Sequence, residues 1–204
     1  REFLKFVGSD ILYWIAITMF QTGLPFFVTS LLKLPETMTT FYFVGMTALS
    51  LVFYIPINKL APKLGKKKLI LTAFVIFSFS YLYTGFLGKI SVISANVQGL
   101  ILMVTASLPM AVFGILPQAV VADIAQSDAK RTGSNREGML YAARTFAFKL
   151  GQSLSMLLFT AVSTVGDSLG TGYRIAAFSA ACFCFLGGII FLFYDEHKLS
   201  RDLR

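Results

Sequence analysis

The chain has little charge, little cysteine and almost no histidine. Only 14% of its 204 residues are charged, whereas an average soluble domain has roughly 25%. The one histidine, His197, and the two cysteines, Cys182 and Cys184, do not make the ligand sets that bind zinc, and we expect no metal centre. Two residues apart on a helix, the two thiols point to different faces and cannot form a disulfide with each other. We interpret them as small apolar filler.

The chain also lacks the motifs of common enzyme sites. It contains no GxSxG, HExxH or P-loop pattern, and the basic segment LGKKKLI (64–70) lacks the spacing and the Ser/Thr of a phosphate-binding loop. We therefore do not expect an enzyme. The ten-residue alternation of a membrane β-barrel is absent, because the stretch 69–87 is apolar on every side. The net charge of +8 does not indicate nucleic-acid binding, since no basic face carries interleaved aromatic residues.

The chain is rich in long apolar blocks, and 56% of its residues are apolar. Six blocks are long enough and poor enough in charge to cross a bilayer. They span about 10–32, 37–58, 69–88, 97–122, 138–165 and 173–194. We predict an all-α membrane protein in which residues 1–204 form a single bundle of six transmembrane helices.

The segments between these blocks are short, so sequential spans should be antiparallel neighbours. The segments 58–68 and 123–137 are expected to be loops. No sequence repeat relates residues 1–96 to residues 97–204. Three spans in each half are nevertheless compatible with a structural repeat.

The basic residues gather on one side of the predicted spans. Thirteen Lys and Arg lie in the two termini and in the segments 58–68 and 123–137, whereas three, Lys33, Lys89 and Arg174, lie on the other side. By the positive-inside rule, the basic side faces the cytoplasm. We expect a multi-pass integral protein of the plasma (inner) membrane with both termini in the cytoplasm.

Lys149 lies in the middle of the fifth predicted span. At 1.5 Å per residue it is roughly 17 Å from the inner end and roughly 21 Å from the outer end, too far for its stem to reach either interface. A lysine at mid-membrane costs on the order of 3 kcal/mol, and such residues usually face a bundle interior or a watery cavity and have a partner. Gln152 and Ser153 extend a polar stripe from it. We interpret Lys149 as part of a substrate or cation pathway; a structural lysine paired with a carboxylate on another helix is the alternative.

Other polar residues are weaker candidates for the same pathway. Arg144 is nearer the inner end, where it either reaches the headgroups or lines an inner mouth. Tyr13, Trp14 and Gln21 on the first span and Gln118 on the fourth are polar or aromatic groups suited to contact a polar substrate. Helix capping explains Asp10 without a site.

The segment around 123–137 offers a candidate cytoplasmic gate. Asp123 and Asp128 either pair with Arg144 or Arg136 or are simply solvated. Further along, Gly151 and Ser155 form a small-xxx-small pair that would let another helix approach closely.

The stretch 120–153, VVADIAQSDAKRTGSNREGMLYAARTFAFKLGQS, resembles the region between the tenth and eleventh helices of the glycoside–pentoside–hexuronide:cation symporters. This is the melibiose-carrier branch of the major facilitator superfamily. Its pattern has an Ala-Asp end to the tenth helix, a D…G…R-x-G loop and a Lys-x-Gly in the eleventh helix. The matching residues, in order and spacing, are Asp123, Asp128, Gly133, Arg136, Gly138, Lys149 and Gly151. The segment 58–68 resembles the cytoplasmic loop after the eighth helix of the superfamily, and FYDEHKLSRDL (193–203) resembles the family's tail.

The resemblance implies the C-terminal six-helix half of a twelve-helix carrier built from inverted three-helix repeats. Such carriers take up a sugar or glycoside with sodium, proton or lithium by alternating access. In such symporters the lysine of the eleventh helix helps to link the cation site to the substrate cavity, and the resemblance assigns this role to Lys149. No cofactor is expected apart from the coupling cation, Na⁺ or H⁺, whose ligands belong mostly to the N-terminal half. The start REFLKF, without Met, favours a fragment; a separately encoded N-terminal half as partner is the alternative.

Two other functions stay open. One is a lysophospholipid-type symporter of the same branch, with which the 21 phenylalanines are compatible. The other is a non-transporting six-helix membrane scaffold that self-associates through Gly151 and Ser155.

Overall fold

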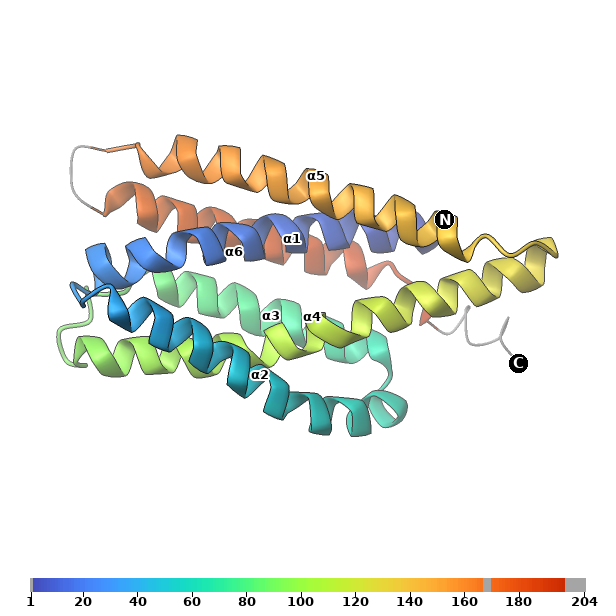
Figure 1. Cartoon of the computed structure of the whole chain (residues 1–204), viewed down its shortest axis with the longest axis horizontal. Helices are drawn as coiled ribbons and strands as arrows, with labels where there is room; N and C mark the ends of the chain where they lie inside the picture. The colour runs from blue at the N-terminus through green and yellow to red at the C-terminus, as the bar shows by residue number, and fades with distance from the viewer. Residues whose placement is uncertain (1, 167–169, 197–204) are drawn as a thin grey trace.

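The computed structural model describes residues 2–166 and 170–196, and these residues form one bundle of long helices (Figure 1). The helices are α1 (Glu2–Phe26), α2 (Thr37–Leu64), α3 (Lys66–Gly85), α4 (Ala95–Thr132), α5 (Glu137–Ser163) and α6 (Thr171–Leu192). A π-helix, η1 (Phe27–Leu31), continues α1. All six are long and apolar enough to cross a membrane, and no strand occurs in the described residues, which confirms the predicted all-α membrane class. His197 lies outside these residues.

The helices extend beyond the predicted spans at one end of the bundle. The prediction of a loop at 58–68 is wrong, because only Gly65 separates α2 from α3. The segment 123–137 is also helical as far as Thr132, and α1 already begins at Glu2. An apolar block marks only the part of a helix that crosses the hydrocarbon, whereas lysine, glutamate and glutamine continue a helix readily in water.

We call this end, where α1 begins and α6 ends, the basic end. The α2–α3 and α4–α5 connections lie there as well, together with most of the described lysines and arginines. The other end carries the α1–α2, α3–α4 and α5–α6 connections, and we call it the opposite end.

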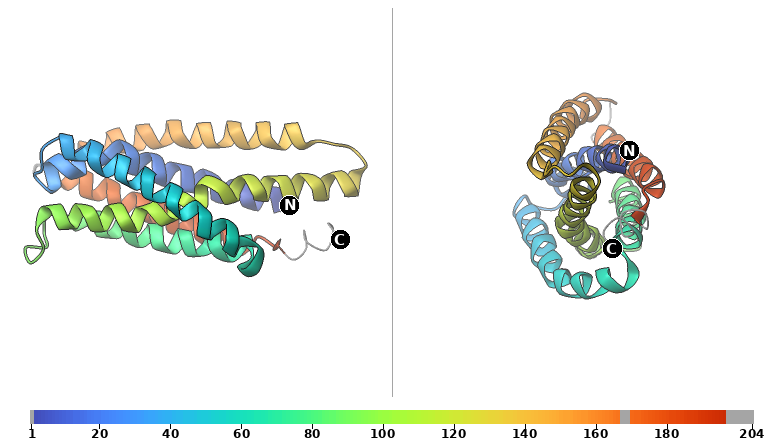
Figure 2. Two further views of the ribbon diagram at one scale, coloured as in Figure 1. Left: turned by 60° about the horizontal axis from the view of Figure 1, so that its bottom comes forward. Right: turned by 90° about the vertical axis from the view of Figure 1, so that its right-hand side faces the viewer.

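The helices pack in two rows, with α3 and α6 in one row and α5, α1, α4 and α2 in the other. α3 and α6 pack against each other, α1 lies against α5 and α6, and α4 lies against α2 and α3. In the end-on view of Figure 2, α5 lies at the top, α2 at the lower left, and α6 and α3 on the right. α2 and α5 are the least buried helices, with 22% of their most apolar stretch buried against 39–56% in the others. The side of α5, α1, α4 and α2 that α3 and α6 do not cover is called the front face below.

The contact pattern contains an internal repeat. If every helix number is shifted by three, the α1–α5 contact becomes α4–α2, α1–α6 becomes α4–α3, and α3–α6 becomes itself. Because α1 starts at the basic end and α4 starts at the opposite end (Figure 1), the two three-helix units have inverted topology. The repeat that the sequence does not display is therefore present in the packing.

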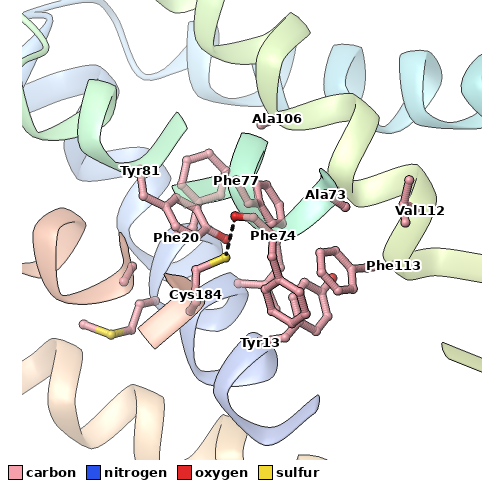
Figure 3. Close-up of a cluster of buried hydrophobic side chains, with 14 of the residues drawn as sticks. Tyr13, Phe20, Ala73, Phe74, Phe77, Tyr81, Ala106, Val112, Phe113 and Cys184 are labelled. Carbon is pink, nitrogen blue, oxygen red and sulfur yellow. Dashed lines mark hydrogen bonds between the residues drawn. The ribbon is translucent and has the colours of Figure 1, made fainter. Parts of the chain in front are cut away.

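An aromatic cluster from α1, α3 and α4 fills the core (Figure 3). Tyr13 stacks on Phe113 with ring centroids 3.9 Å apart and contacts Phe74 edge-on and Phe77 face-on. The Cys184 thiol on α6 donates a weak hydrogen bond to the carbonyl oxygen of Phe74 at 3.6 Å. Cys184 is buried and Cys182 exposed, so the prediction that the two thiols point to different faces is confirmed.

Candidate functional site

Lys149 lies one residue from the middle of α5, and its side chain is exposed. Its ammonium nitrogen is 5.3 Å from the centroid of the Phe148 ring, within cation–π distance. No ion pair to Lys149 occurs within residues 2–166 and 170–196, so the alternative of a lysine paired with a carboxylate finds no partner among them. Lys149 does not face the interior of this bundle. It is presented to whatever covers the outer side of α5.

Phe148 connects Lys149 to α1. The ring of Trp14 stacks on Phe148 with centroids 4.8 Å apart and planes inclined by 27°. The hydroxyl of Thr18, one turn further along α1, is buried without a hydrogen-bond partner. The Trp14 indole N–H is also buried and interacts with the carboxylate of Asp10, one turn earlier on the same helix.

Arg144 and Asp10 form a buried ion pair between α5 and α1. The Arg144 Nε–H and Nη2–H donate to the two carboxylate oxygens of Asp10 at 2.9 and 3.2 Å. The two side chains are 6% and 4% exposed. The predictions that Asp10 caps a helix and that Arg144 reaches headgroups or pairs with Asp123 or Asp128 are therefore wrong. They failed because α1 begins at Glu2, which places Asp10 inside the helix.

The seam between α5 and α1 is built from small residues. A Cβ on Gly151 would lie 3.2 Å from the carbonyl oxygen of Ile11, and the Ser155 hydroxyl donates to the carbonyl oxygen of Ile15 at 2.8 Å. The predicted close approach of another helix is thus confirmed, and that helix is α1. The predicted alternative of self-association through Gly151 and Ser155 is wrong, because both residues are already buried against α1 in this seam.

A polar network joins α3, α4 and the end of α6 at the basic end. Lys66, at the start of α3, forms an ion pair with Asp123 of α4 at 2.6 Å. The carboxylate of Glu196, just after α6, accepts hydrogen bonds from the backbone N–H groups of Lys66 and Lys67 at 2.7 and 3.0 Å. The expectation that Asp123 pairs with Arg144 or Arg136 is therefore wrong, because its carboxylate is paired with Lys66 and its side chain is 28% exposed. Burial, together with the nearby carboxylate of Asp123, raises the pKa of Tyr194 in this network.

The connection from α4 to α5 holds the other charged residues of the sequence motif. Asp128 forms ion pairs with Arg131 at 3.2 Å and with Arg136 at 3.4 Å, so of the alternatives left open for Asp128 the structure shows the pairing with Arg136. Gly133 ends α4 in the left-handed conformation, with φ at 69°. Gly138, in the first turn of α5, is exposed with open space around it.

The remaining predicted pathway residues are not gathered at one point. Tyr13 belongs to the aromatic core and is 5% exposed, so its place in this structure is not on an open surface. Gln21 on α1 and Gln118 on α4 are exposed. Because Gly151 packs beside Ile11 and Lys149 is two residues earlier, Gln21 lies about three turns, roughly 18 Å, beyond the level of Lys149.

Sequence reasoning missed Asp10, Phe148 and Lys66 as members of polar or aromatic contacts around these residues, and it named Trp14 without its partner Phe148. A carboxylate on the first span and an arginine on the fifth are both costly in a membrane, and that shared cost was the one signal for their pairing. No comparable signal in the sequence links Trp14 to Phe148.

An inverted three-helix repeat in six membrane-crossing helices defines half of a major facilitator type of transporter. Residues 1–195 match the MFS/sugar transport protein family, and the chain belongs to that family. It is 25% identical over 223 aligned positions to the uncharacterized symporter sll1374 of Synechocystis sp.. That match covers 100% of this chain and 40% of the symporter. No solved structure matches the chain. The protein is thus a multi-pass membrane protein of this family, and it spans two-fifths of the length of this relative.

Proposed function

We propose that this chain is the C-terminal half of a secondary transporter that carries a sugar or glycoside together with Na⁺ or H⁺ by alternating access. The family and the similarity to a symporter support the general class. The observation that carries the proposal is the exposed ammonium of Lys149, halfway along a membrane helix and without a described counter-charge. A cation at that depth is stable only if it meets water, a polar substrate or charges on further helices.

The partner of the front face is an N-terminal six-helix half. The low burial of α2 and α5 supports this, because these helices flank α1 and α4 and have large apolar surfaces left uncovered by the described residues. The basic end faces the cytoplasm by the positive-inside rule. Substrate then passes between the two halves, along α1, α4 and α5.

Lys149 has two uses in such a pathway. Its ammonium supplies three hydrogen-bond donors for sugar hydroxyls, and its positive charge responds to a cation bound in the other half. We assign most ligands of the coupling cation to the N-terminal half.

The test is transport by the assembled protein. The chain is joined to a cognate N-terminal half and reconstituted into liposomes, and uptake of radiolabelled melibiose, methyl glucoside and xylose is measured with and without a Na⁺ or pH gradient. We expect accumulation above equilibrium that depends on one of the gradients, and protection of Lys149 from an amine-reactive reagent by the transported sugar.

Two results would contradict the proposal. Uptake that is insensitive to sugars and is competed by lysophosphatidylcholine would assign the chain to lysophospholipid transport. Absence of uptake, with labelling of Lys149 unaffected by every sugar, would favour the scaffold.

A further inference from the structure

A cavity of about 280 Å³ lies between the last turns of α1 and the first turns of α2, at the opposite end of the bundle. It is lined by Gln21, Leu24, Pro25, Thr39, Thr40 and Phe43. Figure 1 shows the end of α1 and the start of α2 at the same end of the molecule, far from the start of α1 and the end of α6. The cavity is thus separate from the Arg144–Asp10 pair and from the network at the basic end.

The polar groups of this cavity have unused hydrogen-bonding capacity. The hydroxyl of Thr39 is buried without a hydrogen-bond partner, which is costly unless a ligand or water completes it. The side chains of Gln21 and Thr40 are exposed into the same space. Pro25 has no N–H, so it removes the donor that would otherwise bond to the backbone carbonyl of Gln21.

The backbone beside the cavity is irregular. The π-helix η1 begins two residues after Pro25, and its wider turn interrupts the regular α-helical ladder at this end of α1. Single π-helical turns occur frequently at functional sites. This observation is independent of the unpaired hydroxyl and concerns the same end of the helix.

The lining residues indicate the chemistry of the ligand. None of them is titratable, so the cavity has no counter-charge for an ion. An amide and two hydroxyls suit a ligand with several hydroxyl groups, while Phe43 and Pro25 offer apolar surface for the C–H face of a ring. The volume is slightly below the range of about 300–1,000 Å³ for drug-sized sites, which limits the ligand to about one sugar ring. A lipid tail would leave the Thr39 hydroxyl unpaired.

We infer that this cavity is an outer subsite for one neutral sugar ring, held by Thr39, Gln21 and Thr40 against Phe43. The inference rests on the proposed function and adds a first binding position on the way to Lys149, about three turns deeper. A sugar arriving from outside meets this subsite before it meets the lysine. The subsite contributes to capture of the sugar, not to its coupling with the cation.

The experiment compares Thr39→Val and the double variant Thr39→Val/Gln21→Leu with the parent, in the assembled transporter. Thr39→Val keeps the shape of the side chain and removes only the hydroxyl, so we expect unchanged or slightly raised thermal stability. We expect KM for sugar entering from outside to rise about 2- to 10-fold in the single variant and more in the double variant, with little change in kcat. KM for efflux should stay near that of the parent, because the subsite lies at one mouth only.

Thr47→Val is the matched control on the same helix. Thr47 lies two turns beyond Thr39, does not line the cavity, and uses its hydroxyl within α2 by donating to the carbonyl of Phe43 at 2.9 Å. Its KM in both directions should match that of the parent. A rise in KM for the control equal to that for Thr39→Val would overturn the inference.

The two hypotheses fail in different ways. If the parent transports sugar and both cavity variants match it, the subsite is wrong and the transporter assignment stands. If the parent transports no sugar, the proposed function fails, and the cavity is tested by saturation-transfer NMR with methyl glucoside on the parent and the double variant. Binding that the double variant loses would support the subsite. Absent binding, or binding that the double variant keeps, would overturn it.

Discussion

The guanidinium of Arg144 on α5 binds both carboxylate oxygens of Asp10 on α1, at 2.9 and 3.2 Å. Two parallel N–H···O bonds fix orientation as well as distance. The pair therefore sets both the height and the rotation of α5 against α1, in agreement with the Ser155–Ile15 hydrogen bond further along the same seam. By fixing that rotation, the pair determines that Lys149 points away from the bundle.

Breaking the Arg144–Asp10 pair should be strongly destabilising. Arg144→Gln or Asp10→Asn leaves one buried charge without a counter-charge, and we expect a loss of about 3–5 kcal/mol in the free energy of unfolding. The double variant Asp10→Asn/Arg144→Gln leaves no unpaired charge and should lose less than either single variant. Thermal unfolding of the purified protein in detergent, followed by circular dichroism, measures the cycle.

Lys5→Gln is the control for that cycle. It breaks the Glu2–Lys5 ion pair, which is also 2.9 Å long but has its lysine side chain 38% exposed, and should cost less than about 1 kcal/mol. If Arg144→Gln were as mild as Lys5→Gln, the argument from burial would be wrong.

The features predicted correctly from the sequence depend on local properties. The six spans follow from apolar length, and the close approach at Gly151 and Ser155 follows from small residues four positions apart. The end of α2 and the start of α3 were not predicted, because the segment 58–68 was expected to be a loop. Charged residues end an apolar block there but do not end the helix.

The contacts that define the candidate site depend on which helices are neighbours. Arg144 is 134 residues from Asp10, and Lys66 is 57 residues from Asp123. Neither pairing follows from periodicity on one helix. Tyr13 was misplaced for the same reason, since the sequence does not tell which side of α1 is covered by α3 and α4.

Enlarging Gly151 should open the seam between α5 and α1. A Cβ at this position already approaches the Ile11 carbonyl to 3.2 Å, so Gly151→Leu forces the two backbones apart and should cost about 1–3 kcal/mol. Gly138→Ala, on the same helix but in open space, should be neutral or stabilising by up to about 1 kcal/mol. Melting temperatures of the two variants make the comparison. Equal losses would show that helix propensity, not the seam, controls the outcome.

Removing the Glu196 carboxylate should loosen the start of α3. Two backbone N–H groups at a helix N-terminus lose their acceptor in Glu196→Ala, and we expect a loss of about 1–2 kcal/mol. Glu36→Ala is the matched control, because Glu36 precedes α2 without a capping hydrogen bond. Hydrogen exchange at the amides of Lys66 and Lys67 should quicken only in Glu196→Ala. If the two amides exchange in Glu196→Ala as slowly as in the parent, Glu196 does not cap α3.

Replacing Lys149 should separate function from stability. Since the ammonium has no ion-pair partner among the described residues and is exposed, Lys149→Met removes no described ion pair and should leave the melting temperature unchanged or higher. Sugar uptake by the assembled transporter should fall at least about tenfold, the effect of losing roughly 1.4 kcal/mol of interaction with substrate or cation. Lys89→Met, an exposed lysine in the α3–α4 connection, should transport like the parent. If Lys149→Met transports like the parent, the lysine has no part in the pathway. If Lys149→Met loses both uptake and stability and Lys149→Arg has both, the positive charge at this position stabilises the fold and does not bind the substrate.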